Sequence, residues 1–192
     1  MIAQQRFMFF IDGENLVCRY QDMIKDGYVP SIGVNHLLDT FVWAENVSVP
    51  AIRETQIVRA YYYTSVYGDD NKQQSVGEQL KEIIIQGTPG GARVLYPVMF
   101  KKIRKTEKGK SVDIQLTVDI LSYVYQNNLD TVCLFSGDGD FVPVLKEAIH
   151  FGKHVFVGAL SKGLSPALKR LADEYIRLDG CFFDEVKFRR DY

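Results

Sequence analysis

The chain has 192 residues, 46% of them hydrophobic, and a formal net charge of −1. This length fits one domain (1–192) with a single core. A membrane span needs about 20 apolar residues, and no stretch approaches that length. The near-neutral charge neither requires nor excludes a polyanionic partner, and the N-terminus lacks a signal-peptide layout. Cys18, Cys133 and Cys181 are odd in number and widely spaced, which favours reduced, mostly buried thiols in the cytoplasm.

Strands and helices alternate in the first half of the chain. Residues 6–11 are an apolar run, typical of a strand buried on both faces, and Asp12 follows it. A helix over 15–25 is expected after it, and a second one over 32–45, where apolar residues recur at spacings of three and four. The remaining expected elements of this half are a strand over 57–63, a helix over 71–85 and a strand over 93–99.

The second half continues the alternation. Ser111 is placed to cap a helix, and Asp140 is placed to cap another, with Pro143 in its first turn. The expected elements are helices over 112–125, 140–149 and 164–175 and strands over 131–135, 154–160 and 176–178. Strands that alternate with helices predict βαβ units, a parallel sheet and right-handed crossovers, so the chain is expected to have an α/β fold.

Acidic residues follow two of the expected buried strands. Asp12 ends the first, and Asp138 and Asp140 lie in a glycine-containing loop after strand 131–135. Ligands of open α/β sheets bind at the carboxyl ends of the strands, although an Asx-turn that only connects strand to helix is the alternative. If the two strands are neighbours, three carboxylates share one crevice, where cations must neutralise them. Such oxygen-rich sites select Mg²⁺ or Mn²⁺.

Three further polar residues are candidates for the same site. Asp113 lies in the first turn of the 112–125 helix, where its alternative role is to complement the helix dipole. Asn15 could orient a metal-bound water or only begin a helix, and Ser136 could hydrogen-bond an acid or a phosphate. Asp119 lies roughly 240° around the helix from Asp113, so we expect it to be structural.

A cluster of cations precedes Asp113 along the chain. It consists of Lys101, Lys102, Arg104, Lys105, Lys108 and Lys110. Beside an acidic crevice, such a segment would bind RNA phosphates with steep salt dependence and little sequence preference. The alternative is a solvated surface without a ligand.

Three segments in this order carry a family resemblance: Phe10-Ile11-Asp12-Gly13-Glu14-Asn15, Lys110-Ser111-Val112-Asp113 with Asp119, and Ser136-Gly137-Asp138-Gly139-Asp140-Phe141. Together with Leu168, Ala172, Asp173, Tyr175 and Leu178 they resemble the NYN-domain family of the PIN-like nuclease superfold. The resemblance implies a three-layer α/β/α sandwich with a mainly parallel sheet of five to six strands in the order 3-2-1-4-5. It also implies that Asp12, Asp113, Asp138 and Asp140 hold divalent metal for RNA cleavage, with Asn15 as the family's polar residue. Ser111 departs from the glycine usual in the family.

The sequence thus predicts a metal-dependent ribonuclease that uses Mg²⁺ or Mn²⁺. Endonucleolytic cutting is favoured over exonucleolytic cutting. Its expected partner is single-stranded RNA. Binding to a membrane is not expected, and a homodimer is left open. One alternative is a catalytically inactive RNA-binding or scaffold protein of the same fold. Another is a Toprim-like metal-dependent phosphotransfer domain, for which Glu14 is the available acid. A receiver-type phosphoacceptor domain is disfavoured, because Asp12 has no acidic neighbour before Gly13.

Overall fold

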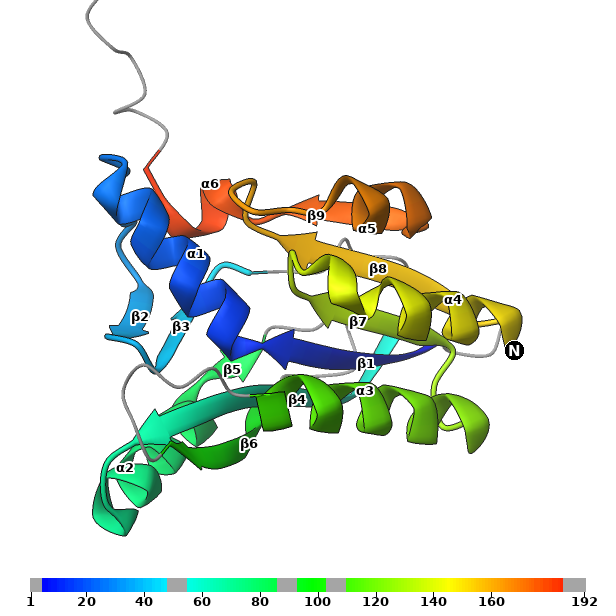
Figure 1. Cartoon of the computed structure of the whole chain (residues 1–192), viewed down its shortest axis with the longest axis horizontal. Coiled ribbons are helices and arrows are strands. Elements are labelled where there is room, and N and C mark those ends of the chain that lie inside the picture. The colour runs from blue at the N-terminus through cyan, green and yellow to red at the C-terminus, as the bar shows by residue number, and fades with distance from the viewer. Residues whose placement is uncertain (1–4, 48–54, 86–92, 103–109, 185–192) are drawn as a thin grey trace, which may run out of the picture.

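A seven-stranded sheet forms the centre of the molecule (Figure 1). The computed structural model describes residues 5–47, 55–85, 93–102 and 110–184. The strands of the sheet are β1 (Gln5–Asp12), β4 (Thr55–Tyr67), β5 (Ile84–Ile85), β6 (Arg93–Lys102), β7 (Thr131–Phe135), β8 (His154–Ala159) and β9 (Glu174–Arg177). A separate hairpin consists of β2 (Val34–Leu37) and β3 (Phe41–Ala44). The helices are α1 (Gly13–Lys25), α2 (Asp70–Glu82), α3 (Lys110–Tyr125), the 3-10 turn η1 (Gly139–Phe141), α4 (Val142–His150), α5 (Pro166–Leu171) and α6 (Asp179–Phe182).

The strand order is β5-β6-β4-β1-β7-β8-β9, and every pairing except that of β5 with β6 is parallel. Among the parallel strands, β6, β4, β1, β7 and β8 follow the expected order 3-2-1-4-5, and the full order differs from it by β5 and β9, which are added at the two edges. The sheet has seven strands rather than five to six. Strand β5 lies in the segment expected to be helical over 71–85, because α2 ends at Glu82 and the chain then pairs with β6.

Helices cover both faces of the sheet, as expected for a three-layer α/β/α fold. On β1, Phe7, Phe9 and Ile11 pack into the cluster that includes α1, α2 and the hairpin. Met8 and Phe10 point to the opposite face, into the cluster that includes α3 and α4. All five side chains are at most 1% exposed. The uniformly apolar sequence of β1 therefore follows from burial on both faces.

The segment expected to be a helix over 32–45 is the β2–β3 hairpin, so that prediction is wrong. Asp39, between the two strands, has a φ of 54°, which suits a tight turn and not a helix. The hydroxyl of Tyr62 on β4 donates to the Val42 carbonyl (3.1 Å) and accepts from the Val42 N–H (3.0 Å). This buried tyrosine fixes β3 as an extended strand, a contact that local spacing cannot reveal.

The last expected helix, over 164–175, is also wrong in its extent. Only α5 is helical, and the chain then forms β9 beside β8. Asp173 makes the change of direction, because its N–H donates to the Val155 carbonyl (2.9 Å) and its carboxylate accepts from the Val155 N–H (2.8 Å). The expected final strand over 176–178 is therefore present, although β9 begins earlier. Ser111, expected to cap α3, lies inside that helix.

Two expectations concern the whole chain, namely membrane-spanning segments and the burial of the cysteine thiols. Within the described ranges, no helix is both long enough and apolar enough to cross a membrane. The three cysteines are free thiols, but only Cys133 is buried, whereas Cys18 is exposed and Cys181 is half-buried. The expectation of mostly buried thiols is thus wrong for Cys18, which faces outward from the amphipathic helix α1.

Gly13, at the start of α1, should not tolerate a side chain. A Cβ atom there would lie 2.2 Å from Cε1 of Tyr62 and 2.7 Å from the Tyr63 carbonyl oxygen. We expect Gly13→Ala to lower the free energy of unfolding by about 1–3 kcal/mol, measured by urea denaturation. The added methyl group would force α1 away from β4, and the packing between them would be lost. Gly77→Ala in α2 is the matched control, since its Cβ would meet only the flexible end of Met99 (2.9 Å). Equal effects of the two substitutions would contradict this prediction.

Candidate active site

The carboxyl ends of β1 and β7 meet at the centre of the sheet. The strands pair in parallel, with Ile11 opposite Phe135, so that Asp12 and Ser136 are neighbours at the sheet edge. The Ser136 hydroxyl donates to Oδ2 of Asp12 (2.8 Å), and the N–H of Gly137 donates to Oδ1 of Asn15 (3.0 Å). The loop after β7 is therefore hydrogen-bonded to the beginning of α1, and the structure brings Asp12, Asn15 and Ser136 together.

Asp12 is held by the elements on both sides of it. Its Oδ1 accepts from the backbone N–H of Asn15 (3.0 Å), so it is the N-cap of α1. Its side chain is buried, because the loops after β1 and β7 close over it. One carboxylate thus begins a helix and also accepts from the neighbouring strand's loop, which fixes its orientation before any ligand binds.

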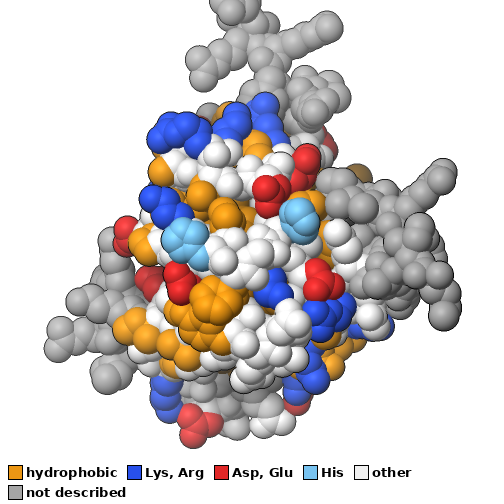
Figure 2. Space-filling model, turned by 90° about the vertical axis from the view of Figure 1, so that its right-hand side faces the viewer, with side chains coloured by type: hydrophobic (Ala, Val, Ile, Leu, Met, Phe, Trp, Pro, Cys, Tyr) orange, Lys and Arg blue, Asp and Glu red, His pale blue; other side chains and the backbone are white. Residues whose placement is uncertain are grey.

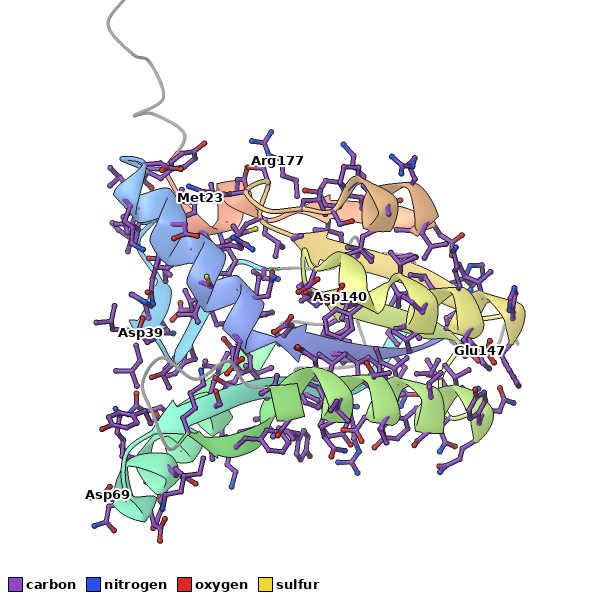
Figure 3. All side chains as sticks on the ribbon, in the orientation of Figure 1. Met23, Asp39, Asp69, Asp140, Glu147 and Arg177 are labelled. Carbon is purple, nitrogen blue, oxygen red and sulfur yellow. The ribbon has the colours of Figure 1, made fainter. Side chains whose placement is uncertain are left out.

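The Ser-Gly-Asp-Gly-Asp loop is shaped by its own hydrogen bonds. The N–H of Asp138 donates to Oγ of Ser136 (3.1 Å), and Oδ1 of Asp138 accepts from the N–H of Asp140 (3.0 Å). Asp138 therefore caps η1, and the expectation that Asp140 caps the following helix is wrong, because α4 begins only at Val142. Figure 3 shows Asp140 at the start of this helical segment, near the tips of β1 and β7, with Glu147 at its far end.

Burial raises the pKa of Asp12 to about 7 from its ordinary value of 3.8. Hydrogen bonds from Asn15 and Ser136 act in the opposite direction, and the negative charges of Asp113 and Glu14 raise the pKa further. The deprotonated form of Asp12 is consequently unfavourable in the metal-free protein. A cation placed against this carboxylate would favour deprotonation, which is the behaviour expected of a metal ligand.

The first turn of α3 brings Asp113 into the electrostatic range of Glu14, Asp138 and Asp140. Desolvation raises the pKa of Asp113, and so do the negative charges of Glu14, Asp138 and Asp140. Asp119, on the same helix, accepts hydrogen bonds from the Tyr63 hydroxyl (2.8 Å) and the Gln115 amide (2.8 Å). Asp119 therefore has the structural role expected for it, and Asp113 has the electrostatic neighbours expected for a site residue.

The donor set fits a hard divalent cation in its chemistry. Asp12, Asp113, Asp138 and Asp140 offer only oxygen ligands. Desolvation and, after it, the repulsion between carboxylates raise the pKa of Asp113, and a cation would relieve that repulsion. Among the described residues, no three Asp, Glu, His or Cys side chains are placed closely enough to hold one ion. Binding of an ion would therefore involve rotation of the outer carboxylates toward Asp12.

The cations of the expected basic segment have different partners. Lys101 forms an exposed ion pair with Asp70 on α2 (2.6 Å). Lys102 instead pairs with Glu14 (2.8 Å), and both side chains are largely buried. Glu14 also accepts a hydrogen bond from the Ser65 hydroxyl. Three of the expected RNA-binding residues and one side chain lie outside the described residues, namely Arg104, Lys105 and Lys108 and the side chain of Lys110 at the start of α3.

Sequence reasoning missed two residues beside the crevice. It did not assign Lys102 to an ion pair with Glu14, because the partners lie on β6 and α1, far apart in the chain. It also overlooked Arg19, which lies four residues after Asn15 on α1. Residues at this spacing share one helix face. The spacing from Asn15 was therefore a usable signal that Arg19 faces the same crevice.

The amino ends of the parallel strands carry a different surface. On the face seen in Figure 2, acidic, basic and hydrophobic side chains are interspersed. Arg6 and Asp130 form an ion pair there (2.7 Å), at the beginnings of β1 and β7. Opposite charges are thus paired at this end of the sheet, whereas like-charged carboxylates gather at the other.

Comparisons with known proteins agree with this arrangement. A family model described as NYN domain matches residues 6–179. An uncharacterized protein of Methanocaldococcus jannaschii, MJ0482, is 36% identical over 67 residues, which are 35% of this chain and 28% of that protein. The crystal structure of VPA0982, a protein of unknown function from Vibrio parahaemolyticus, superposes with a TM-score of 0.61 at 18% identity. That superposition covers 96% of this chain and 99% of the other, and it supports the fold alone.

Proposed function

Because this chain belongs to the NYN-domain family, we propose that it is a metal-dependent ribonuclease that cleaves RNA phosphodiester bonds at the carboxyl ends of β1 and β7. One observation above all supports this proposal. Asp12 is buried, has a pKa of about 7, and is hydrogen-bonded to Ser136 of the neighbouring acidic loop. A protein with only a structural need at this position would gain stability from a neutral residue there, so the retained acid suggests a cation-binding function.

Four carboxylates would hold one or two Mg²⁺ or Mn²⁺ ions: Asp12, Asp113, Asp138 and Asp140. When bound, such ions polarise the scissile phosphate and lower the pKa of a water molecule for in-line attack. Ser136 already donates to Asp12 and accepts from Asp138, so its part would be to orient these acids and not to bind phosphate. The amide oxygen of Asn15 accepts a hydrogen bond from the Gly137 N–H, so its amide nitrogen would be the atom that donates to substrate.

The proposed substrate is single-stranded RNA. A flexible backbone can enter a crevice at a sheet edge more readily than a duplex can. The cations between Lys101 and Lys110 lie before Asp113 in the chain and would contact phosphates that flank the cut. Such contacts release counterions and make the affinity strongly dependent on salt. Lys102, which lies against Glu14, would sit closest to the carboxylates.

The test is cleavage of labelled RNA by the purified full chain. We expect cutting of single strands with Mn²⁺ or Mg²⁺, slower cutting of duplexes, and no cutting in EDTA, because the carboxylates cannot activate water without a cation. Gel electrophoresis of the products would also separate endonucleolytic from exonucleolytic cutting. RNA binding without cleavage under any metal condition would support the inactive RNA-binding protein instead. The Toprim-like alternative gains no support, since Glu14 is engaged by Lys102 and Ser65.

A further inference from the structure

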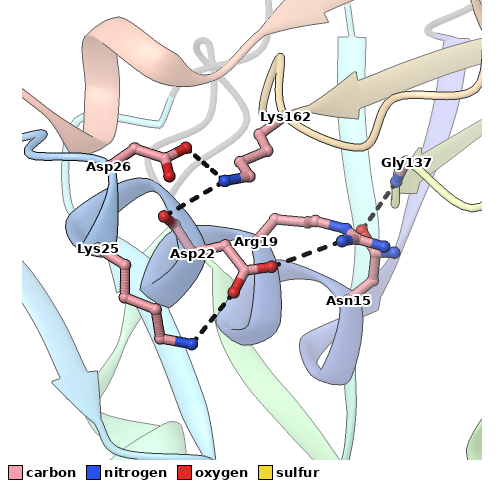
Figure 4. A network of polar contacts seen from close by, with 7 residues as sticks. All are labelled: Asn15, Arg19, Asp22, Lys25, Asp26, Gly137 and Lys162. Carbon is pink, nitrogen blue, oxygen red and sulfur yellow. Dashed lines mark hydrogen bonds and ion pairs between the residues drawn. The ribbon is translucent and has the colours of Figure 1, made fainter.

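The side chain of Arg19 lies beside the loop that carries Ser136 and Gly137 after β7 (Figure 4). Figure 4 shows it beside Asn15 and close to Gly137 in the loop after β7. Arg19 comes one helical turn after Asn15, so both residues lie on the same face of α1. Gly163, in the loop between β8 and α5, lies against the same side chain, because a Cβ atom at this position would overlap it. Three segments distant in sequence therefore surround this arginine.

The guanidinium of Arg19 is almost without hydrogen-bond partners. A guanidinium carries five N–H donors. Within the described part of the chain, its polar contact is a long ion pair with Asp22 (3.6 Å), and its buried Nε has no acceptor. The nearby cations differ, since Lys25 pairs with Asp22 at 3.2 Å and Lys162 pairs with Asp26. Arg19 is thus the cation of this network whose outer guanidinium donors, on the Nη atoms, are left for a ligand.

Shape, and not hydrogen bonding, holds this side chain in place. Gly163 has a φ of 78°, and a Cβ atom there would lie 2.4 Å from Nε of Arg19. Only glycine leaves room for the arginine in this position. The side chain is still 36% exposed, so its outer edge is open to solvent while its stem is enclosed. A cation held in a fixed orientation loses little conformational entropy when it binds a ligand.

We propose that Arg19 binds a backbone phosphate of RNA next to the phosphate that the carboxylates would cleave. The planar guanidinium matches a phosphate through two parallel N–H···O bonds. The acids of the crevice would repel a polyanion, and a fixed cation one helical turn from Asn15 would counteract that repulsion. The inference rests on the proposed function, because it takes RNA as the ligand, but it concerns binding and not the chemical step.

The test compares Arg19→Gln with Lys25→Gln in the full 192-residue chain. Binding of a fluorescein-labelled single-stranded RNA is measured by anisotropy in EDTA at several salt concentrations. We expect Arg19→Gln to weaken binding roughly tenfold, the loss typical of one charge-assisted contact. The slope of log affinity against log salt should fall by about 0.7, the value for one phosphate contact of a single strand. Lys25→Gln removes the same charge from the same helix and the same partner, Asp22, and should change affinity about twofold at most.

One further variant and one further readout keep the result unambiguous. Arg19→Lys retains the charge but not the planar fork, so it should keep the salt slope and lose part of the affinity. Thermal melting of Arg19→Gln should resemble that of the parent, because the Asp22 pair is long and half-exposed. Should Arg19→Gln melt early, Arg19→Lys decides: parental affinity in that variant would overturn the fork-like phosphate contact.

Equal losses in Arg19→Gln and Lys25→Gln would overturn the proposal, since they would indicate only general electrostatics. An unchanged affinity and slope in Arg19→Gln would overturn it as well. These outcomes differ from a failure of the proposed function, because binding is measured without metal. A parent protein that binds RNA through Arg19 but never cleaves it would refute the nuclease and leave the phosphate site standing.

Discussion

Asp138→Asn should abolish RNA cleavage while leaving the fold intact. Removal of a metal ligand forfeits several kcal/mol of charge stabilisation in the transition state, so we expect the rate to fall at least about 100-fold. Asparagine retains the oxygen that accepts from the N–H of Asp140 (3.0 Å), so η1 should keep its cap. The rate is measured with saturating RNA and Mn²⁺, and the fold by circular dichroism and thermal melting.

The matched control is Glu174→Gln, which neutralises an exposed carboxylate on β9, away from the crevice. This variant should cleave RNA at the parental rate. A parental rate in Asp138→Asn would refute Asp138 as a ligand. Equal loss of activity in both variants would point to a general effect of charge, and the acidic crevice would then lose its assigned role.

Asp12→Asn should stabilise the metal-free protein at pH 8. The folded pKa of Asp12 is about 7, above its ordinary value of 3.8. The neutral carboxyl therefore contributes stability that is complete below the unfolded pKa and is lost as the pH rises through the folded pKa. The parent should lose on the order of 4 kcal/mol across this window as an upper bound, a loss that asparagine cannot suffer because it does not ionise. Urea unfolding of both proteins in EDTA at pH 4 and pH 8 measures the difference, which should be small at pH 4.

Added Mn²⁺ should reverse the order at pH 8, because a ligand that binds only the native state stabilises it. The parent should gain stability with Mn²⁺ concentration, and Asp12→Asn should gain much less. Asp130→Asn is the control of opposite sign, because the Arg6 guanidinium lowers the pKa of Asp130 and makes its charged form favourable. That variant should be less stable than the parent at pH 8. If Asp12→Asn also unfolds more easily at pH 8 without metal, Asp12 is a structural residue and the site assignment fails.

Some of the site was predictable because its signals are local. A run of apolar residues that ends in an acid defines β1 with Asp12, and a similar run defines β7 before the Asp138 loop. Burial on both faces leaves no other position for such strands than the middle of a sheet. The carboxyl ends of neighbouring parallel strands then coincide, so the meeting of Asp12 with the loop of Ser136 followed from sequence and strand order together.

Other features depended on contacts between segments distant in the chain. Residues 32–45 carry helical spacing, yet the hydroxyl of Tyr62 holds Val42 in a strand. Glu14 lies two residues after Asp12 in the sequence, but Lys102 on β6 balances its charge. Arg19 is one of two cations on α1, and its spacing from Asn15 indicates its helix face, but the space that it fills exists because residue 163 is a glycine. Local patterns report burial and backbone preference, so they determined which strands end in acids. The partners of each charge, and the surface that each cation faces, were decided by tertiary packing, because the free energy of a charge depends on the neighbours that the whole fold brings to it.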